Sequence, residues 1–370
     1  MKFSCSTKPL IDALNLGIVN QNVSKFYQKS CLAQLTADKH TLRVNLEADG
    51  VLTELHLKGS GDAEETVTIF VDSLTLKQLV ATFEAPVTSF EFTEGGLVLH
   101  SGKSKFNLPK MIDGEELELK APARAEAANP VIDIDKSDWK FIKDYQMYAI
   151  AMSFIHPVYT KVWVGSEGDV IVGDFDNSLF THSKKSKLGK TCLLRDTVIN
   201  LFNTLPDGAK LTQLDRSYLI TVQTDGFEYA SEFTPQYEED AGVGSYNSEI
   251  ILGMMSTDEA KAIKVNVAAI NKFLNQAALL SSGTEDVITF SYDVDQVTLK
   301  DNNVDCKIDV AGAPGVEHYE VQFKTTLLKS VVGNCDEDEV KVAPMVQEDT
   351  VIGITVWTKN MTVILAGIDD

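Results

Sequence analysis

The sequence predicts an α+β protein made of three repeated domains, each with helices on one face of an antiparallel sheet. Short amphipathic helix patterns recur at similar intervals along the 370 residues, and runs with the two-residue alternation of strands flank each of them. Two polar or Ala/Pro-containing joints separate the repeats. We therefore expect domains over residues 1–122, 130–246 and 249–370.

One helix pattern lies in the second half of each repeat. Its equivalent apolar positions Leu76, Val198 and Leu328 are separated by 122 and 130 residues. The predicted helices cover residues 74–83, 197–205 and 327–335, and a predicted strand precedes each of them at 66–71, 190–194 and 319–323. This spacing indicates repetition of a single unit of about 120 residues.

Another helix pattern opens each repeat, at residues 10–19, 138–151 and 269–280. Strand patterns follow all three, so each repeat reads helix, strands, helix, strands. The first joint, "APARAEAANP" (121–130), ends in a proline that suits the residue before a strand. The second joint, at 236–248, is polar and contains glycine.

Two segments resemble a nucleotide-binding phosphate loop, "SGKSKFNL" (101–108) and "LGKTC" (188–192). The signature requires another glycine five residues before the conserved one, and those positions hold Leu97 and Lys184. A phosphate loop also joins a strand to a helix, whereas the alternation around residues 97–108 predicts strand, turn, strand. We therefore interpret the first segment as a hairpin.

Composition limits the class of protein. A net charge of −21 argues against nucleic acid as a partner of the surface as a whole, although binding depends on where the positive charges lie. No apolar run has the length of a membrane span, and Pro9 and Asp12 interrupt any signal-peptide pattern. The five cysteines are scattered and predict reduced thiols, so we expect a cytoplasmic protein.

Motifs for catalysis or metal binding are lacking in the sequence. The acidic stretches "GDFDNS", "YDVDQ" and "DEDE" do not follow the calcium-loop pattern, and the six histidines form no pair at ligand spacing. There is no G-x-S-x-G motif. We expect no enzyme, no metal and no cofactor, although a hydrolase that uses scattered carboxylates stays an alternative.

Four segments resemble one family in order along the chain: "MKFSCSTKPLIDAL", "FVDSLTLKQLV", "SGKSKFNLPKM" and "GITVWTKNMTVILAG". The third is similar to the S-G-x-S-x-F-x-L stretch of the bacterial-type sliding clamp, the DNA polymerase III β subunit. The chain departs from that family at its ending, "ILAGIDD", and at "GDFDNSLF" (173–180), where the family has T-D-G-H-R-L. Such divergence suits a phage- or plasmid-encoded clamp.

The resemblance implies the DNA clamp fold. Two three-domain subunits would join head to tail as a homodimer, and the helices would line the central channel of the ring. The ring would encircle double-stranded DNA without sequence preference, would be placed there by a clamp loader and would tether a DNA polymerase as its processivity factor. The alternative is a β-rich structural or assembly protein that does not bind DNA.

Basic residues of the predicted helices are the candidate DNA contacts. Lys136, Lys140 and Lys143 form one stripe, which is an ordinary solvated face unless the helix lines a channel. The corresponding candidates on the other helices are Lys8, Lys77, Lys272, Gln276 and Lys329. The basic segment 183–187 is either a solvated turn or a DNA-contacting edge.

Two further sites follow from the resemblance. The family's partner-peptide pocket maps to Phe175, Leu179, Ile250, Val363 and Leu365, although strand core is the alternative interpretation, above all for Val363. The subunit interface maps to Phe106 and Leu108 in the first domain. These would meet Leu279 and Leu280 at the end of a third-domain helix.

Overall fold

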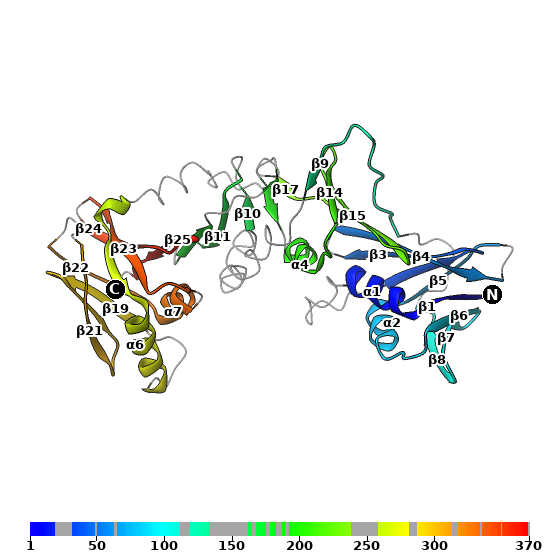
Figure 1. Cartoon of the computed structure of the whole chain (residues 1–370), viewed down its shortest axis with the longest axis horizontal. Coiled ribbons are helices and arrows are strands. Elements are labelled where there is room, and N and C mark those ends of the chain that lie inside the picture. Colours follow the sequence, from blue (N-terminus) through cyan, green and yellow to red (C-terminus); the bar gives the residue numbers. More distant parts are fainter. Residues whose placement is uncertain are drawn as a thin grey trace. The chain divides into compact units, whose positions relative to one another are not determined.

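A computed structural model gives the structure of the protein (Figure 1). It describes residues 1–18, 32–48, 50–62, 65–111, 119–133, 162–164, 168–174, 178–182, 187–188, 192–194, 196–237, 258–280, 287–312, 317–333, 335–348 and 350–368. Antiparallel strands dominate these residues, and helices pack on one face of the sheets, so the predicted α+β class is confirmed. None of the helices in these ranges combines the length and apolar character needed to cross a bilayer.

The chain divides into two compact units. The first comprises Met1–Lys143 and Leu194–Gln236, and the second Asp144–Leu193 and Tyr237–Asp370. The strands of the predicted middle domain are thus shared between the units, because they join the sheets of both. The exact boundaries of the three domains stay a prediction.

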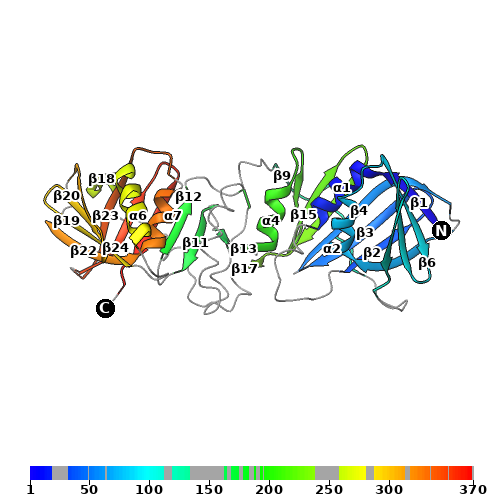
Figure 2. The ribbon, with the colours of Figure 1, turned by 90° about the horizontal axis from the view of Figure 1, so that it is seen from below.

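The first unit contains two helix-and-sheet segments. Its N-terminal elements are β1 (Lys2–Ser6), α1 (Thr7–Gly17), β2 (Leu32–Ala37), β3 (Thr41–Ala48), β4 (Val51–Gly61), β5 (Val67–Asp72), α2 (Ser73–Val80), β6 (Val87–Thr93), β7 (Gly96–Ser101) and β8 (Ser104–Pro109). The others are β9 (Val131–Asp133), α4 (Asp196–Thr204), β14 (Lys210–Gln213), β15 (Tyr218–Gln223) and β16 (Phe227–Phe233). Figure 2 shows α1 and α2 side by side over this sheet.

The second unit holds the remaining elements. They are β10 (Val162–Val164), β11 (Val170–Asp174), β12 (Ser178–His182), β13 (Cys192–Leu194), β17 (Gln236–Tyr237), the 3-10 helix Glu259–Lys261, β18 (Ile263–Asn266), α6 (Val267–Leu280), β19 (Val287–Asp293), β20 (Gln296–Lys300), β21 (Asp305–Asp309), β22 (His318–Lys324), α7 (Thr325–Gly333), β23 (Glu339–Gln347), β24 (Thr350–Trp357) and β25 (Met361–Ala366). Helices α6 and α7 pack together over its apolar core.

The order of elements repeats along the chain. Residues 2–109 and 263–366 both run strand, helix, four strands, helix, three strands. Residues 131–233 show the same order where they are described, and the predicted helix 138–151 lies outside the described residues. The repeat found in the sequence is therefore a repeat of supersecondary structure.

Helix α2 shows how local sequence sets an element. Its N-cap is Asp72, whose carboxylate accepts a 2.7 Å hydrogen bond from the Thr75 N–H. The predicted helix reaches residue 83, but the observed one ends at Val80. Beyond it the N–H of Phe83 bonds to the carbonyl three residues back, and the Phe83 ring stacks on Phe106 at a centroid distance of 5.2 Å. Phe83 thus lies in a turn beyond the helix, where its ring packs on strand β8.

The hairpin predicted in place of a phosphate loop is confirmed. Strands β7 and β8 pair from Gly96↔Pro109 to Ser101↔Ser104, so that the turn has two residues. Gly102 in this turn has φ +57°, a conformation that glycine adopts at little cost. Leu97, Leu99 and Leu108 are buried on one face. No strand-to-helix connection exists at this place.

Two joints between repeats are built by the same pairing. In the first unit the fourth strand of one repeat, β4, pairs with the last strand of the next, β16, over seven residue pairs. In the second unit β12 pairs with β25 over five residue pairs, and these strands hold the same two places in their repeats. The sheet therefore continues through backbone hydrogen bonds from each repeat into the next.

The start of the predicted linker and the residues just before it contact strands at the first joint. The Leu119 N–H donates to the Gln34 side chain on β2 at 2.8 Å, and the Ala123 N–H donates to Glu232 on β16 at 2.7 Å. Glu232 also accepts a 2.6 Å hydrogen bond from the Ser217 hydroxyl. The linker is thus tied to strands on both sides of the β4–β16 joint, which it reinforces.

A charged group beside this linker makes the fold sensitive to acid. Glu54 on β4 lies 2.7 Å from the His56 ring nitrogen and 3.7 Å from Arg43. The hydrogen bond with His56 is the main reason that the pKa of Glu54 is lowered. A carboxyl whose pKa is lowered on folding stabilises the fold at pH above its unfolded value and loses that contribution as pH falls through its folded value.

We therefore expect Glu54→Gln to lower the free energy of unfolding by about 1 kcal/mol at neutral pH, and by progressively less as pH falls below about 4. Urea unfolding of both proteins across this range measures the difference. Glu47→Gln, at an exposed glutamate of β3, is the control. A difference that does not change with pH would contradict this assignment.

Candidate functional site

Charge is distributed unevenly between the helices and the rest of the protein. The sequence has 54 acidic residues, yet the helices α1, α2, α4, α6 and α7 together hold only Asp12 and Asp196, and no glutamate. The same helices carry Lys8, Lys77, Lys272 and Lys329. Over the described helices the net charge is therefore slightly positive, although the protein as a whole is strongly negative.

Lys8 lies on the exposed face of α1. Its side chain is 85% exposed, but its Nζ forms a 3.0 Å ion pair with Asp12 one turn further along the helix. The apolar face of α1, including Leu10 and Leu14, is buried against the sheet. The i, i+4 spacing thus puts both charges on the face that the sheet leaves open.

Lys77 on α2 is half-buried, and its Nζ is 3.4 Å from the Ile18 carbonyl oxygen at the end of α1. Burial lowers the pKa of this lysine. The ammonium group therefore lies at the negative end of the α1 dipole, where a cation is stabilised. This contact gives Lys77 a role in joining the two helices.

Helices α6 and α7 carry the remaining candidates that are described. Lys272 and Gln276 are one turn apart on α6, and both are exposed. Lys329 is exposed on α7. The opposite face of α6, with Ile270 and Phe273, is buried in the core of the second unit.

Several predicted DNA contacts lie outside the residues that the structure describes. Lys136, Lys140 and Lys143 lie outside the described residues, as do residues 183–186 of the basic segment. The last residue of that segment, Lys187, is exposed. Contact of these residues with DNA stays a prediction.

The predicted interface residues lie beside two unpaired sheet edges. Strand β8, which carries Phe106 and Leu108, ends one sheet, and β21 ends another, within the described strands. Leu108 is buried and Phe106 is half-buried against Phe83. By contrast, Leu279 and Leu280 at the end of α6 are 84% and 58% exposed.

The predicted peptide pocket is described only in part. Val363 and Leu365 are fully buried in the hydrophobic core of the second unit, as the strand-core alternative holds. The Leu179 backbone pairs with Ile364 in the β12–β25 joint. Phe175 and Ile250 lie outside the described residues. The pocket as a whole therefore stays a prediction.

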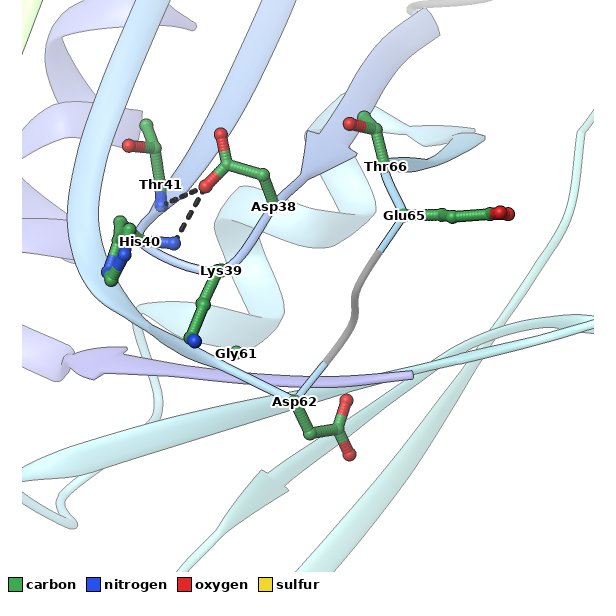
Figure 3. Close-up of a pocket in the computed structure, with 8 residues that line it drawn as sticks. All are labelled: Asp38, Lys39, His40, Thr41, Gly61, Asp62, Glu65 and Thr66. Carbon is green, nitrogen blue, oxygen red and sulfur yellow. Dashed lines mark hydrogen bonds between the residues drawn. The ribbon is translucent and has the colours of Figure 1, made fainter.

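A hollow at the β2–β3 turn has a volume of about 750 Å³ (Figure 3). Asp38 accepts hydrogen bonds from the His40 and Thr41 N–H groups at 2.7 and 2.8 Å, which lowers its pKa. Figure 3 shows Asp62 and Glu65 pointing away from Asp38. Nowhere in the described ranges do three or more His, Cys, Asp or Glu side chains gather as metal ligands.

Asp12 and Phe83 are neighbours of the candidate sites that sequence reasoning missed. The i, i+4 spacing from Lys8 could have revealed the ion pair of Asp12. Nothing in the sequence indicated that Phe83 stacks on Phe106, because these residues come from a turn and a strand that only the tertiary fold brings together.

Comparison with known proteins identifies the fold as that of the DNA sliding clamps. No family model and no curated protein sequence matches the chain. Among solved structures, the chain is similar over its full length to the DNA polymerase sliding clamp of Caulobacter crescentus, with a TM-score of 0.75 and 14% identity over all of that chain. It is also similar to the DNA polymerase III β subunit of Thermotoga maritima, with a TM-score of 0.75, 14% identity and 99% of that chain covered.

A third similar structure is the Helicobacter pylori β clamp bound to a DNA ligase peptide, with a TM-score of 0.70, 10% identity and full coverage of both chains. The low identity accords with the divergence noted in the motifs. The predicted clamp fold is therefore confirmed, with the whole chain contributing to it.

Proposed function

We propose that the protein is a DNA sliding clamp, a processivity factor in which two copies join head to tail, encircle duplex DNA and tether a polymerase. No bond is made or broken in this function, so it needs no catalytic group. The observation that carries the proposal is the pairing rule of the joints. Among the described strands, it leaves the outer edges of one last strand, β8, and one fourth strand, β21, without a joint.

The rule follows from the two joints described above. Each uses the fourth strand of one repeat and the last strand of the next. Strand β8 is the last strand of the first repeat, and β21 is the fourth strand of the third repeat. Pairing of β8 with β21 of a second copy forms the same joint, and two such contacts close a ring with no unpaired end.

Charges on these edges support the same register as the β4–β16 joint. In that joint, Phe227 is the first residue after the β15–β16 turn. It pairs with Leu57, the seventh residue after the β3–β4 turn. The equivalent register sets Ser104 opposite Val310, and therefore Lys105 opposite Asp309. Lys105 and Asp309 are exposed and oppositely charged, which favours pairing of two different edges over self-pairing of either.

The helices supply the surface for DNA. Their lysines and amides suit loose phosphate contacts, which position a protein on DNA without reading sequence. The acidic groups, nearly absent from these helices, would repel the duplex. A protein that slides needs this combination, because strong or base-specific contacts would hold it at one place.

Partners of this clamp would be a DNA polymerase, a clamp loader and other proteins that carry short docking peptides. The similar Helicobacter pylori clamp was solved with a DNA ligase peptide, which supports peptide docking as the mode of tethering. We place the docking site near Leu179, Phe175 and Ile250. A cytoplasmic location is consistent with Cys5, Cys306 and Cys335, which are free thiols that form no disulfide.

A threading experiment tests encirclement without a loader. The protein is mixed with linear duplex DNA that has biotinylated ends, streptavidin is added to block the ends, and free protein is removed by gel filtration at salt high enough to screen phosphate contacts. We expect the protein to stay on blocked DNA and to slide off DNA with open ends, because only topology holds it.

Blocking the ends before the protein is added is the control, and we expect little binding in that case. Equal retention on open and blocked DNA, or undiminished binding to DNA blocked beforehand, would show that the protein does not encircle the duplex.

A further inference from the structure

We infer that the described helices do not grip DNA equally: among them, α6 and α7 make the main phosphate contacts, while Asp12 neutralises the face of α1. This inference rests on the proposed function and names the residues that carry it. It follows from the partners that the basic side chains of the described helices already have within the protein.

On the α1–α2 pair both ammonium groups are engaged. The Nζ of Lys8 is 3.0 Å from the Asp12 carboxylate. Because this separation is much shorter than the Debye length of about 8 Å, a phosphate that approaches Lys8 meets Asp12 as well, and the two charges nearly cancel. Lys77 is half-buried with its Nζ at the Ile18 carbonyl, so it offers little charge to a ligand.

On the α6–α7 pair, no acidic side chain of the described residues pairs with the lysines. Neither helix contains an acidic residue, and Lys272 and Lys329 are exposed with no ion pair formed by either among the described residues. Gln276, one turn after Lys272, adds an amide donor on the same face. This pair therefore presents two full positive charges to a phosphate backbone.

Equivalent positions of α1 and α6 carry opposite charges. With Leu14 of α1 equivalent to Leu274 of α6, Asp12 occupies the place of Lys272. One repeat thus has an acid where another has a base. The consequence is a weaker hold on DNA than uniform lysines would give, which favours sliding.

Binding to a short fluorescent duplex, measured by anisotropy over a range of salt concentrations, tests this inference. Each phosphate contact contributes about −0.9 to the slope of log affinity against log salt. We expect Lys272→Gln and Lys329→Gln to make the slope shallower by about one each. Lys8→Gln should change it little, and Asp12→Asn, which frees Lys8, should steepen it by about one.

Matched controls are Lys300→Gln on β20 and Asp293→Asn on β19, which make the same charge changes. Both residues are exposed, while the residues that alternate with them along these strands face the core. If Lys8→Gln weakens binding as much as Lys272→Gln, or Asp12→Asn has no effect, the unequal grip is wrong although the clamp function stands. If none of the helix variants differs from the controls, the described helices do not contact DNA and the inference fails, whereas the threading experiment tests the clamp function separately.

Discussion

The double variant Leu279→Ala, Leu280→Ala is expected to convert the ring into folded monomers at micromolar concentration. Both side chains are largely exposed in the single chain, at 84% and 58%, so their loss leaves the fold of each copy intact. In the proposed ring they are buried beside the β8–β21 joint, where each contributes about 1.5–3 kcal/mol. Losing both weakens each joint by a factor of about 10² or more, since 1.4 kcal/mol is tenfold.

Analytical ultracentrifugation of the variant and the natural protein measures this effect, and circular dichroism checks the fold. Val294→Ala is the control, because Val294 is also strongly exposed in the second unit, at 71%, but lies in the β19–β20 turn. A double variant that dimerises with unchanged affinity would show that the end of α6 is not part of the joint. The proposed pairing of β8 with β21 would then not involve the end of α6.

Leu365→Ala is expected to lower the free energy of unfolding of the second unit by about 2–5 kcal/mol, as large-to-small changes in a packed core do. Leu365 is fully buried on β25 and pairs with Ile354 on β24. Because no part of its surface is accessible, any loss of affinity for a partner peptide should follow from the loss of stability. It should not reflect a direct contact with the peptide.

Thermal unfolding and calorimetric titration with a polymerase tail peptide separate these effects. Ile352→Ala, at a 40% exposed position on β24, is the control and should change stability far less. If Leu365→Ala leaves stability unchanged while peptide affinity falls, Leu365 contacts the peptide directly and the core assignment is wrong.

Much of the fold could be predicted from sequence because it depends on local pattern. The period of the apolar residues located the helices to within a few residues, as for the segment predicted at 269–280 and observed at Val267–Leu280. The missing glycine at position 97 and the alternation after it excluded a phosphate loop and predicted the β7–β8 hairpin. Similar helix patterns at similar spacing revealed the repeat, since each repeat must bury the same kind of face.

The sequence by itself also selected the residues that could contact DNA and those that could form the joint, but not their environment. Only the tertiary structure decided that Lys77 points to the end of α1, that Leu108 is already buried, and that Leu279 and Leu280 are exposed. Burial and pairing depend on which strands and helices are brought together from distant parts of the chain. A lysine in a helical stripe, or a leucine in an alternating strand, has the same local signal whether its partner is water, a carbonyl oxygen or a second copy of the protein.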